Sequence, residues 1–545
     1  MIKVLDNPFY YLDNFHRVLE WIGARYADLL TDEEAAFIAR FPTLPQGARA
    51  LFVRMVMRKG VLFRASKLSY AEIGSAIEAA RPLLAAGWVE ADPLIELDAL
   101  FDLLSKPEIG SAFALPQHAK GSRKAEQLEA LRADFADARP FSAWFADSGD
   151  VAYHILAKPL CDRLRLIFFG NYHQDWTDFV LSDLGMYTFE AVDISPDSRG
   201  FRNRRDIDNY LALHACTERH YAGDDPGEVL KAIPPGELGN EWLEGRREKL
   251  LFLVGQQFEK LQDWPASHDI YARCRYPGAR ARAIRVLEKA ERYAEAFTLL
   301  EQAQAAPESE AEHQQLLRVA PRLRRKLGHP KLAATIGAVV QRIDLQLPMP
   351  QEHWWVEGVV RDHLSSLDAP VFYVENALIN SLFGLLCWRA VFAAIPGAFF
   401  HPFHRGPADL HSADFHQRRK AEFDACLAEL HNERYRTTIK QNFAAKAGVQ
   451  SPFLYWEALS EELIDLALDC IPAVHLEKAF ERILADVQAN RSGFPDLIQF
   501  WPAERRYRMI EVKGPGDRLQ DNQLRWIDYC AEHGMPVSVC YLQWA

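Results

Sequence analysis

The sequence predicts a multidomain protein in which a mostly α-helical N-terminal two-thirds precedes a C-terminal α/β domain with a mixed sheet. A chain of 545 residues exceeds the size of one domain. Apolar residues recur at helical spacing through most of the first 345 positions. Near the C-terminus, two strand-like runs separated by a turn stand between amphipathic segments. Half of the residues are apolar and a quarter are charged, as in globular proteins.

Residues 1–120 are expected to form a helical module with a short β element. Apolar residues have helical spacing in 47–58 and 70–86, and a short strand is expected next. This order resembles a winged helix, and two short helices expected at 97–104 and 107–114 resemble a SAP-type pair. Modules of both types hold duplex DNA through backbone contacts. Scaffolding is an equally common use of small helical units, so it stays open as the alternative.

A helical linker domain is expected over residues 121–225. Within it, the predicted helix 201–215 begins with Arg202, Arg204 and Arg205. Basic side chains at a helix N-terminus oppose the helix macrodipole. They therefore indicate either a contact with a phosphate or a solvated helix end.

Residues 226–345 are expected to form paired-helix repeats. The stretches 258–267 and 287–296 both contain Glu-Lys, a polar turn and an aromatic residue, and they begin 29 residues apart. That spacing is close to the period of tetratricopeptide (TPR) repeats, so the array is interpreted as TPR-like. Such arrays present concave surfaces to partners. Protein scaffolding is the usual role, whereas Arg280 and Arg282 favour contact with a DNA backbone.

A predicted β-hairpin near the C-terminus carries the candidate catalytic residues. Asp496 stands where the first strand begins, and Glu511 and Lys513 lie on the second strand. Side chains alternate between the faces of a strand, so Glu511 and Lys513 share one face. The hairpin can bring the carboxylate of Asp496 beside that of Glu511. An ordinary surface ion pair is the alternative interpretation.

Two carboxylates and an ammonium group in one small space suit metal-assisted phosphodiester hydrolysis. Hard cations such as Mg²⁺ or Mn²⁺ take oxygen ligands, polarise the phosphoryl oxygen and lower the pKa of a bound water. Asp496 and Glu511 are the expected ligands. Lys513 is expected to hold the attacking water and to offset charge that develops on the phosphate.

The hairpin motif resembles that of the PD-(D/E)xK nuclease superfamily, and its flanks resemble the virus-type replication-repair nuclease (VRR-NUC) branch. The matching runs are 490–497, 511–515 and 517–519, with Gln523 and Trp526 after them. Together with the chain length and a second run at 166–181, they resemble the Fanconi-associated nuclease family in a compact bacterial form.

The resemblance implies a VRR-NUC nuclease domain over residues 351–545. It adds Glu375, at the start of an apolar helix expected over 377–394, and the carbonyl of Val512 to the metal site. It implies a structure-specific DNA endonuclease that cuts near 5′ flaps and branched ends, with 5′-to-3′ exonuclease capacity and a role in interstrand-crosslink repair. The expected partner is branched or flapped DNA.

Further DNA contacts are predicted in the nuclease domain. The segment 415–446 is helical and basic, and Arg418, Arg419 and Lys420 lie near its start. Gln523 lies on one face of an amphipathic helix expected over 519–533, where it reaches the site or fills the core. The alternative interpretation of each basic cluster is a solvated helix face, which is the usual role of such a cluster.

Several function classes are excluded or disfavoured. The eight cysteines form no CxxC pair, which fits reduced thiols in a bacterial cytoplasm. The protein is expected to associate with the nucleoid when it is bound to DNA. No signal-peptide core or uninterrupted apolar span is present, so no membrane partner is expected. No Walker A loop indicates a nucleotide cofactor. A non-catalytic adaptor for branched DNA and a Holliday-junction resolvase remain the alternatives; an RNA-processing nuclease is disfavoured because no aromatic stacking platform is evident.

Overall fold

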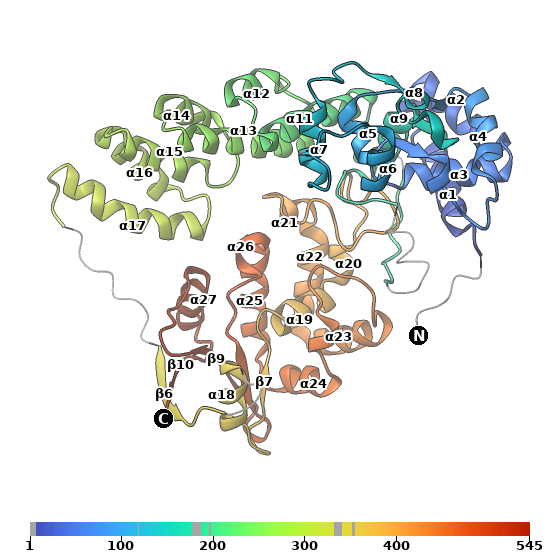
Figure 1. Cartoon of the computed structure of the whole chain (residues 1–545). Helices are drawn as coiled ribbons and strands as arrows, with labels where there is room; N and C mark the ends of the chain where they lie inside the picture. Colours follow the sequence, from blue (N-terminus) through green and yellow to red (C-terminus); the bar gives the residue numbers. More distant parts are fainter. Residues whose placement is uncertain (1–6, 118, 177–186, 196–197, 332–339, 351–354) are drawn as a thin grey trace. The chain divides into compact units, whose positions relative to one another are not determined.

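The computed structural model describes residues 7–117, 119–176, 187–195, 198–331, 340–350 and 355–545. These residues belong to two compact units, 1–187 with 201–204, and 188–200 with 205–545 (Figure 1). Positions 177–181 of the second family-like run and the expected start of the nuclease domain at 351–354 lie outside the described residues.

The first unit is mostly helical with two small sheets. The strand expected after the second predicted helix is β2 (Val89–Ala91), which pairs with β5 (Ala152–Ile155), and β5 pairs in turn with β1 (Leu62–Arg64). The rings of Phe37, Phe52 and Trp88 meet in the core beside this sheet. The remaining elements are α1 (Tyr10–Arg25), α2 (Asp32–Arg40), α3 (Gln46–Val56), α4 (Ala76–Ala85), α5 (Leu97–Leu103), α6 (Lys106–Ala112), α7 (Lys124–Leu131), α8 (Phe141–Trp144), α9 (Lys158–Phe169) and the pair β3 (Leu94–Ile95) and β4 (Arg139–Pro140).

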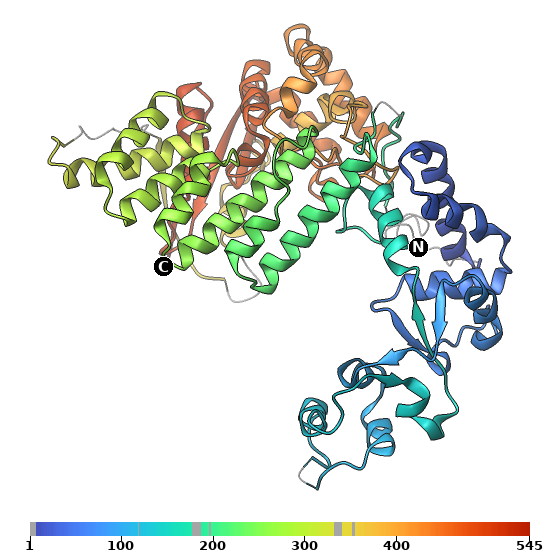
Figure 2. The same cartoon turned by 90° about the horizontal axis from the view of Figure 1, so that it is seen from above.

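The predicted helical repeats are present in the second unit. Consecutive helices from α13 onward pack side by side in both views (Figures 1 and 2), because each buries one apolar stripe against its neighbours. The residues that pack between them are aliphatic, small or aromatic, such as Leu287, Ala283 and Tyr271. The helices of this region are α11 (Arg204–Ala222), α12 (Pro226–Ala232), α13 (Glu241–Lys260), α14 (Trp264–Arg273), α15 (Ala279–Lys289), α16 (Tyr293–Ala305) and α17 (Glu310–Lys326).

A five-stranded mixed sheet forms the C-terminal domain, as predicted. Its order is β6-β10-β9-β8-β7, with β10 parallel to β6 and β9, and β8 antiparallel to β7 and β9. The predicted hairpin and closing strand are β8 (Leu497–Trp501), β9 (Arg506–Lys513) and β10 (Val537–Trp544). The sequence does not predict β6 (Gln341–Leu347) or β7 (Val371–Tyr373). β7 is too short for a period-two pattern to be recognised, and β6 is half-exposed at the edge of the sheet.

Helices cover both faces of this sheet. Val360 of α18 (Val356–Leu364) packs against Ile510 and Val512, whereas Tyr507, on the opposite face of β9, bonds His475 of α25 (Ala473–Ala485) at 2.9 Å. The apolar helix expected over 377–394 is divided at Cys387 into α19 (Leu378–Leu386) and α20 (Trp388–Val391). The other helices are α21 (Phe415–Arg418), α22 (Lys420–Leu427), α23 (Arg434–Ala445), α24 (Glu461–Cys470), α26 (Val487–Asn490) and α27 (Asp521–Glu532). Among the described residues, no helix has the length and apolar character needed to cross a bilayer.

Candidate active site

The hairpin of β8 and β9 brings the three predicted catalytic residues together. Leu497 is opposite Ile510 in the antiparallel pair, so the preceding residue, Asp496, reaches the end of β9. There the backbone N–H of Val512 donates a hydrogen bond of 2.8 Å to Oδ2 of Asp496. On β9 itself, the Lys513 ammonium nitrogen lies 2.7 Å from Oε1 of Glu511. The sequence prediction of a shared face is thereby confirmed for Glu511 and Lys513.

These three charged side chains are buried, which is costly for ionised groups. The relative exposure is 6% for Asp496, 0% for Glu511 and 7% for Lys513. Burial raises the pKa of Asp496 to about 6, although the Val512 N–H and the Lys513 ammonium oppose the increase. Burial, followed by the charge of Asp496, raises the pKa of Glu511 to about 8 against the effect of Lys513. Without a cation, the pair therefore retains a proton near neutral pH.

The donor set fits a hard divalent cation. Lys513 forms the ion pair with Oε1 of Glu511, and no described group donates a hydrogen bond to Oε2 although this carboxylate is fully buried. An unsatisfied buried carboxylate oxygen is rare, and a metal ion is one explanation for it. Across the described residues, no three His, Cys, Asp or Glu side chains are grouped closely enough for a metal site. Asp496 and Glu511 thus offer two ligands, and open positions would remain for water and a phosphate.

Glu375 lies in the turn between β7 and α19, rather than on the helix. Tyr373 donates a hydrogen bond of 2.6 Å to Oε2 of Glu375. The charge of Glu375 raises the pKa of both Asp496 and Glu511, so it acts on the same pair. Its place as a metal ligand stays a prediction, as does that of the Val512 carbonyl.

Sequence reasoning missed a further acid, Glu357, in the first turn of α18. Its charge also raises the pKa of Asp496. The start of α18 packs closely on the end of β9, because a Cβ on Gly514 would lie only 3.3 Å from a methyl group of Val356. An acid in the first turn of a helix is common because of the helix dipole, so nothing in the sequence distinguishes Glu357.

Arg419 is a correction to the predicted DNA contacts. Its side chain is fully buried, and its guanidinium forms two bonds of 2.8 Å with the Asp409 carboxylate. A group enclosed in this way cannot meet a DNA backbone. Arg419 instead neutralises a buried acid, and the basic run that suggested DNA binding gives no indication of that distant partner.

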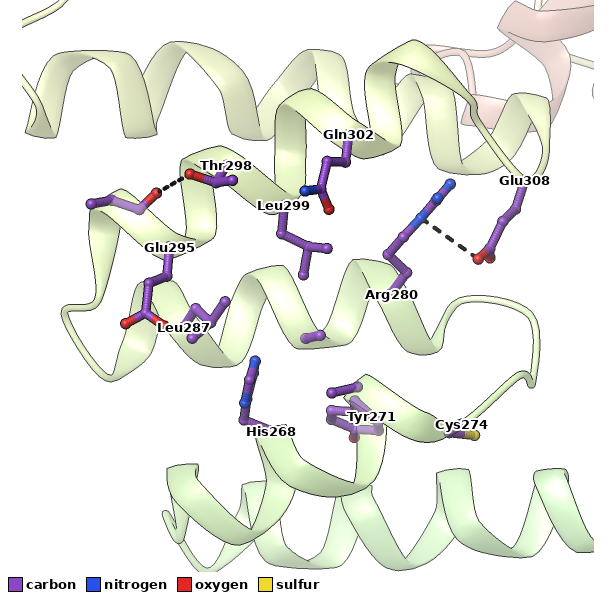
Figure 3. Close-up of a pocket in the computed structure, with 13 residues that line it drawn as sticks. His268, Tyr271, Cys274, Arg280, Leu287, Glu295, Thr298, Leu299, Gln302 and Glu308 are labelled. Atoms are coloured by element: carbon purple, nitrogen blue, oxygen red, sulfur yellow. Dashed lines mark hydrogen bonds and ion pairs between the residues drawn. The ribbon is translucent and has the colours of Figure 1, made fainter.

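Other predicted arginines are also bound to carboxylates. Arg204 lies 2.6 Å from the buried Glu34. Arg280 lies 2.6 Å from Glu312 and 3.6 Å from Glu308. Arg280 and Glu308 line a cavity in the helical repeats with a volume of about 540 Å³. Figure 3 shows the side chains around this cavity. In the same way, Arg282 is paired with Glu259 and Arg418 with Asp409. A phosphate would have to compete with these protein carboxylates.

Three further predicted basic residues lie on the surface, and Gln523 forms a local hydrogen bond. Arg202 and Arg205 are exposed, and Lys420 is exposed with a contact of 2.6 Å to Asp424 one helical turn away. Gln523 accepts a hydrogen bond of 2.8 Å from the N–H of Gln520, which caps α27. This local bond explains the presence of a glutamine at the start of the helix without a substrate.

Comparison with known proteins agrees with this site. Family models match residues 9–90 (FAN1, HTH domain), 94–144 (Fanconi anemia-associated nuclease SAP domain) and 430–544 (VRR-NUC domain). The Fanconi-associated nuclease 1 homolog of Pseudomonas aeruginosa is 56% identical over 99% of this chain and 97% of its own length. The chain belongs to the Fanconi-associated nuclease family. The Arabidopsis thaliana homolog is 24% identical over 97% of this chain and 66% of its own length.

Solved structures match the fold as well. The crystal structure of paFAN1 bound to 2nt 5′flap DNA with gap is 55% identical, covers 100% of both chains and has a TM-score of 0.93. A second paFAN1 structure, with a 1nt 5′flap DNA, has a TM-score of 0.91 over 99% of this chain and 100% of the other. Family membership identifies the chain as a nuclease and implies that its catalysis depends on a divalent metal ion.

Proposed function

We propose that the chain hydrolyses DNA near 5′ flaps and branched ends, with 5′-to-3′ exonuclease capacity, by using Mg²⁺ or Mn²⁺. One observation carries the proposal: two buried carboxylates share a site with an ammonium group, and an oxygen of Glu511 has no donor in the described part of the chain. The flap preference is supported by the 55% identity to paFAN1, which was crystallised on 5′ flap DNA.

Each residue of the site has a chemical task in this proposal. A bound divalent cation would polarise the phosphoryl oxygen and lower the pKa of a bound water. Asp496, held by the Val512 N–H, and Glu511 would hold that cation, and Glu375 and the Val512 carbonyl are the further ligands that the family resemblance implies. Lys513, already placed by Glu511, orients the attacking water and stabilises negative charge on the phosphate.

The DNA duplex is held by surfaces outside the hairpin. The matches to HTH and SAP modules support duplex binding by residues 9–90 and 94–144. Exposed Arg202, Arg205 and Lys420 are the proposed phosphate contacts. In the cell, we expect the protein to act at the nucleoid in the bacterial cytoplasm, in interstrand-crosslink repair. The eight free cysteines are compatible with a reducing compartment.

A cleavage panel tests the proposal. Single-stranded, nicked, 5′-flap, 3′-flap and four-way substrates are incubated with the wild type and Asp496→Ala, with Mg²⁺ or Mn²⁺. The wild type is expected to cut the 5′ flap fastest, whereas Asp496→Ala binds the same DNA without cutting it. Equal cutting by Asp496→Ala, or a preference for the 3′ flap, would refute the corresponding part of the proposal. A monomer that cuts would also argue against a resolvase with two symmetric sites.

A further inference from the structure

Asn376, the neighbour of Glu375, has an unusual backbone conformation. Its φ is +51°, in the left-handed region that asparagine tolerates better than most residues. It occupies the turn between β7 and α19. This conformation lets the two ends of its side-chain amide reach groups on different segments of the chain.

The amide oxygen of Asn376 holds the segment that leads into Asp496. It accepts hydrogen bonds from the backbone N–H of Gly493 at 2.8 Å and of Phe494 at 3.2 Å. Gly493 has a φ of +96°, and a Cβ there would lie 2.7 Å from the backbone of Asn522, so only glycine fits. Asn376 therefore fixes the backbone of Gly493 and Phe494, which leads into Asp496.

The amide nitrogen of Asn376 contacts the carboxylate of Glu375. It donates to Oε1 at 3.3 Å, while Tyr373 donates to Oε2 at 2.6 Å from the other side. The two donors together orient Glu375. A backbone hydrogen bond also joins the two segments directly, since the Val374 N–H donates to the Asp496 carbonyl at 2.8 Å.

A second asparagine supports the same turn. The side-chain nitrogen of Asn380, which is almost fully buried, donates to the Asn376 carbonyl at 2.7 Å and to the Arg491 carbonyl at 2.8 Å. The turn after β7 and the loop before β8 are thus joined by two side-chain amides in addition to the backbone hydrogen bond between Val374 and Asp496. Such hydrogen bonds commonly determine the orientation of a ligand carboxylate.

We propose that Asn376 is a positioning residue that couples Glu375 to Asp496, with Tyr373 as the second support of Glu375. One amide contacts both Glu375 and the segment that leads into Asp496, two acids that are separated by 120 residues of sequence. The proposal deepens the proposed function and rests on it, because Glu375 must serve the metal ion.

Metal binding by the full-length protein without DNA tests the coupling. Asn376→Gly keeps the left-handed backbone accessible and removes all three of these side-chain hydrogen bonds, to Gly493, Phe494 and Glu375. Calorimetry is expected to find that it binds Mn²⁺ about tenfold more weakly. Cleavage should recover when Mn²⁺ is raised, which a purely structural defect would not produce. The matched control is Glu433→Gly, another left-handed residue, with φ of +60°, whose Mn²⁺ affinity should not change.

A double-mutant cycle separates the coupling from the role of Glu375. In a Glu375→Gln background, adding Asn376→Gly should lower the Mn²⁺ affinity by a smaller factor than in the wild type, because only the support of the segment before Asp496 is then lost. An equal loss in both backgrounds, or wild-type affinity in Asn376→Gly, would overturn the coupling. If Asn376→Gly does not fold, Tyr373→Phe removes only one hydroxyl and should weaken Mn²⁺ binding in the same direction; an unchanged affinity overturns the proposal. Failure of the proposed function would differ, because Asp496→Ala would then still cut DNA.

Discussion

The β8–β9 hairpin and the arginine clusters contain similar charged groups in opposite situations. In the hairpin, Glu511 is fully buried, and one of its oxygens has no donor among the described residues. In the clusters, guanidinium groups are matched by protein carboxylates, as with Arg419 and Asp409 at 2.8 Å. A charge matched inside the protein stabilises the fold, whereas a buried carboxylate oxygen without a donor indicates a ligand. Four mutational or thermodynamic experiments follow from this contrast.

The largest effect is expected from neutralising Glu511, whose Oε2 has no donor among the described residues. Glu511→Gln should lower the rate of DNA cleavage by roughly 10³-fold or more, because it removes a metal ligand at the reacting phosphate. Affinity for a 5′-flap duplex, measured by fluorescence anisotropy, should remain close to that of the wild type. The control is Glu504→Gln at the exposed tip of the hairpin, where Glu504 forms an ion pair with Arg506. A Glu511→Gln protein that cuts at the wild-type rate is incompatible with the assigned role.

The matched charge should instead affect stability. Arg419→Leu leaves the buried Asp409 with fewer donors, so the free energy of unfolding should fall by about 3–5 kcal/mol. Lys420→Gln, at an exposed neighbouring position, should change it by less than about 0.5 kcal/mol. Urea denaturation of both variants makes the comparison. Wild-type stability in Arg419→Leu would show that this buried pair contributes little.

The third prediction concerns the proton that Glu511 releases when Mn²⁺ binds. Because the pKa of Glu511 is raised to about 8, binding of Mn²⁺ at pH 7 should release about one proton. Calorimetry in two buffers with different ionisation enthalpies measures this release. The raised pKa of Glu511 also affects the stability of the metal-free protein. Because the folded state binds this proton more tightly than the unfolded state, it favours folding at low pH. That contribution to the free energy of unfolding is lost as the pH rises from 4.5 to about 8. Glu511→Gln should abolish both effects, and metal binding without proton release would contradict the raised pKa.

The smallest effect is expected for exposed basic residues. Lys420→Gln should weaken binding to flapped DNA a few-fold and lower the magnitude of the salt slope by about 1 if Lys420 meets one phosphate. Arg205→Gln provides an independent test at another exposed position. Titrations at several salt concentrations measure both slopes. Unchanged slopes would leave the duplex contacts to other surfaces.

The parts of the fold that the sequence predicts correctly are those fixed by short-range rules. Strand alternation and a turn place Glu511 and Lys513 on one face, and helical spacing identifies the repeats. Partners that are distant in sequence are not accessible to these rules. Asp409 for Arg419, Glu34 for Arg204, and the contribution of Glu357 appear only when the chain has folded. β7 was missed because three residues carry too little periodicity.

The central claim is that Asp496 and Glu511 hold a divalent cation beside Lys513. Anomalous X-ray diffraction from crystals soaked in Mn²⁺ tests it most directly. We predict one strong peak within about 2.0–2.3 Å of a carboxylate oxygen of both residues. A peak elsewhere, or no peak at Mn²⁺ concentrations that support cleavage, would contradict the claim.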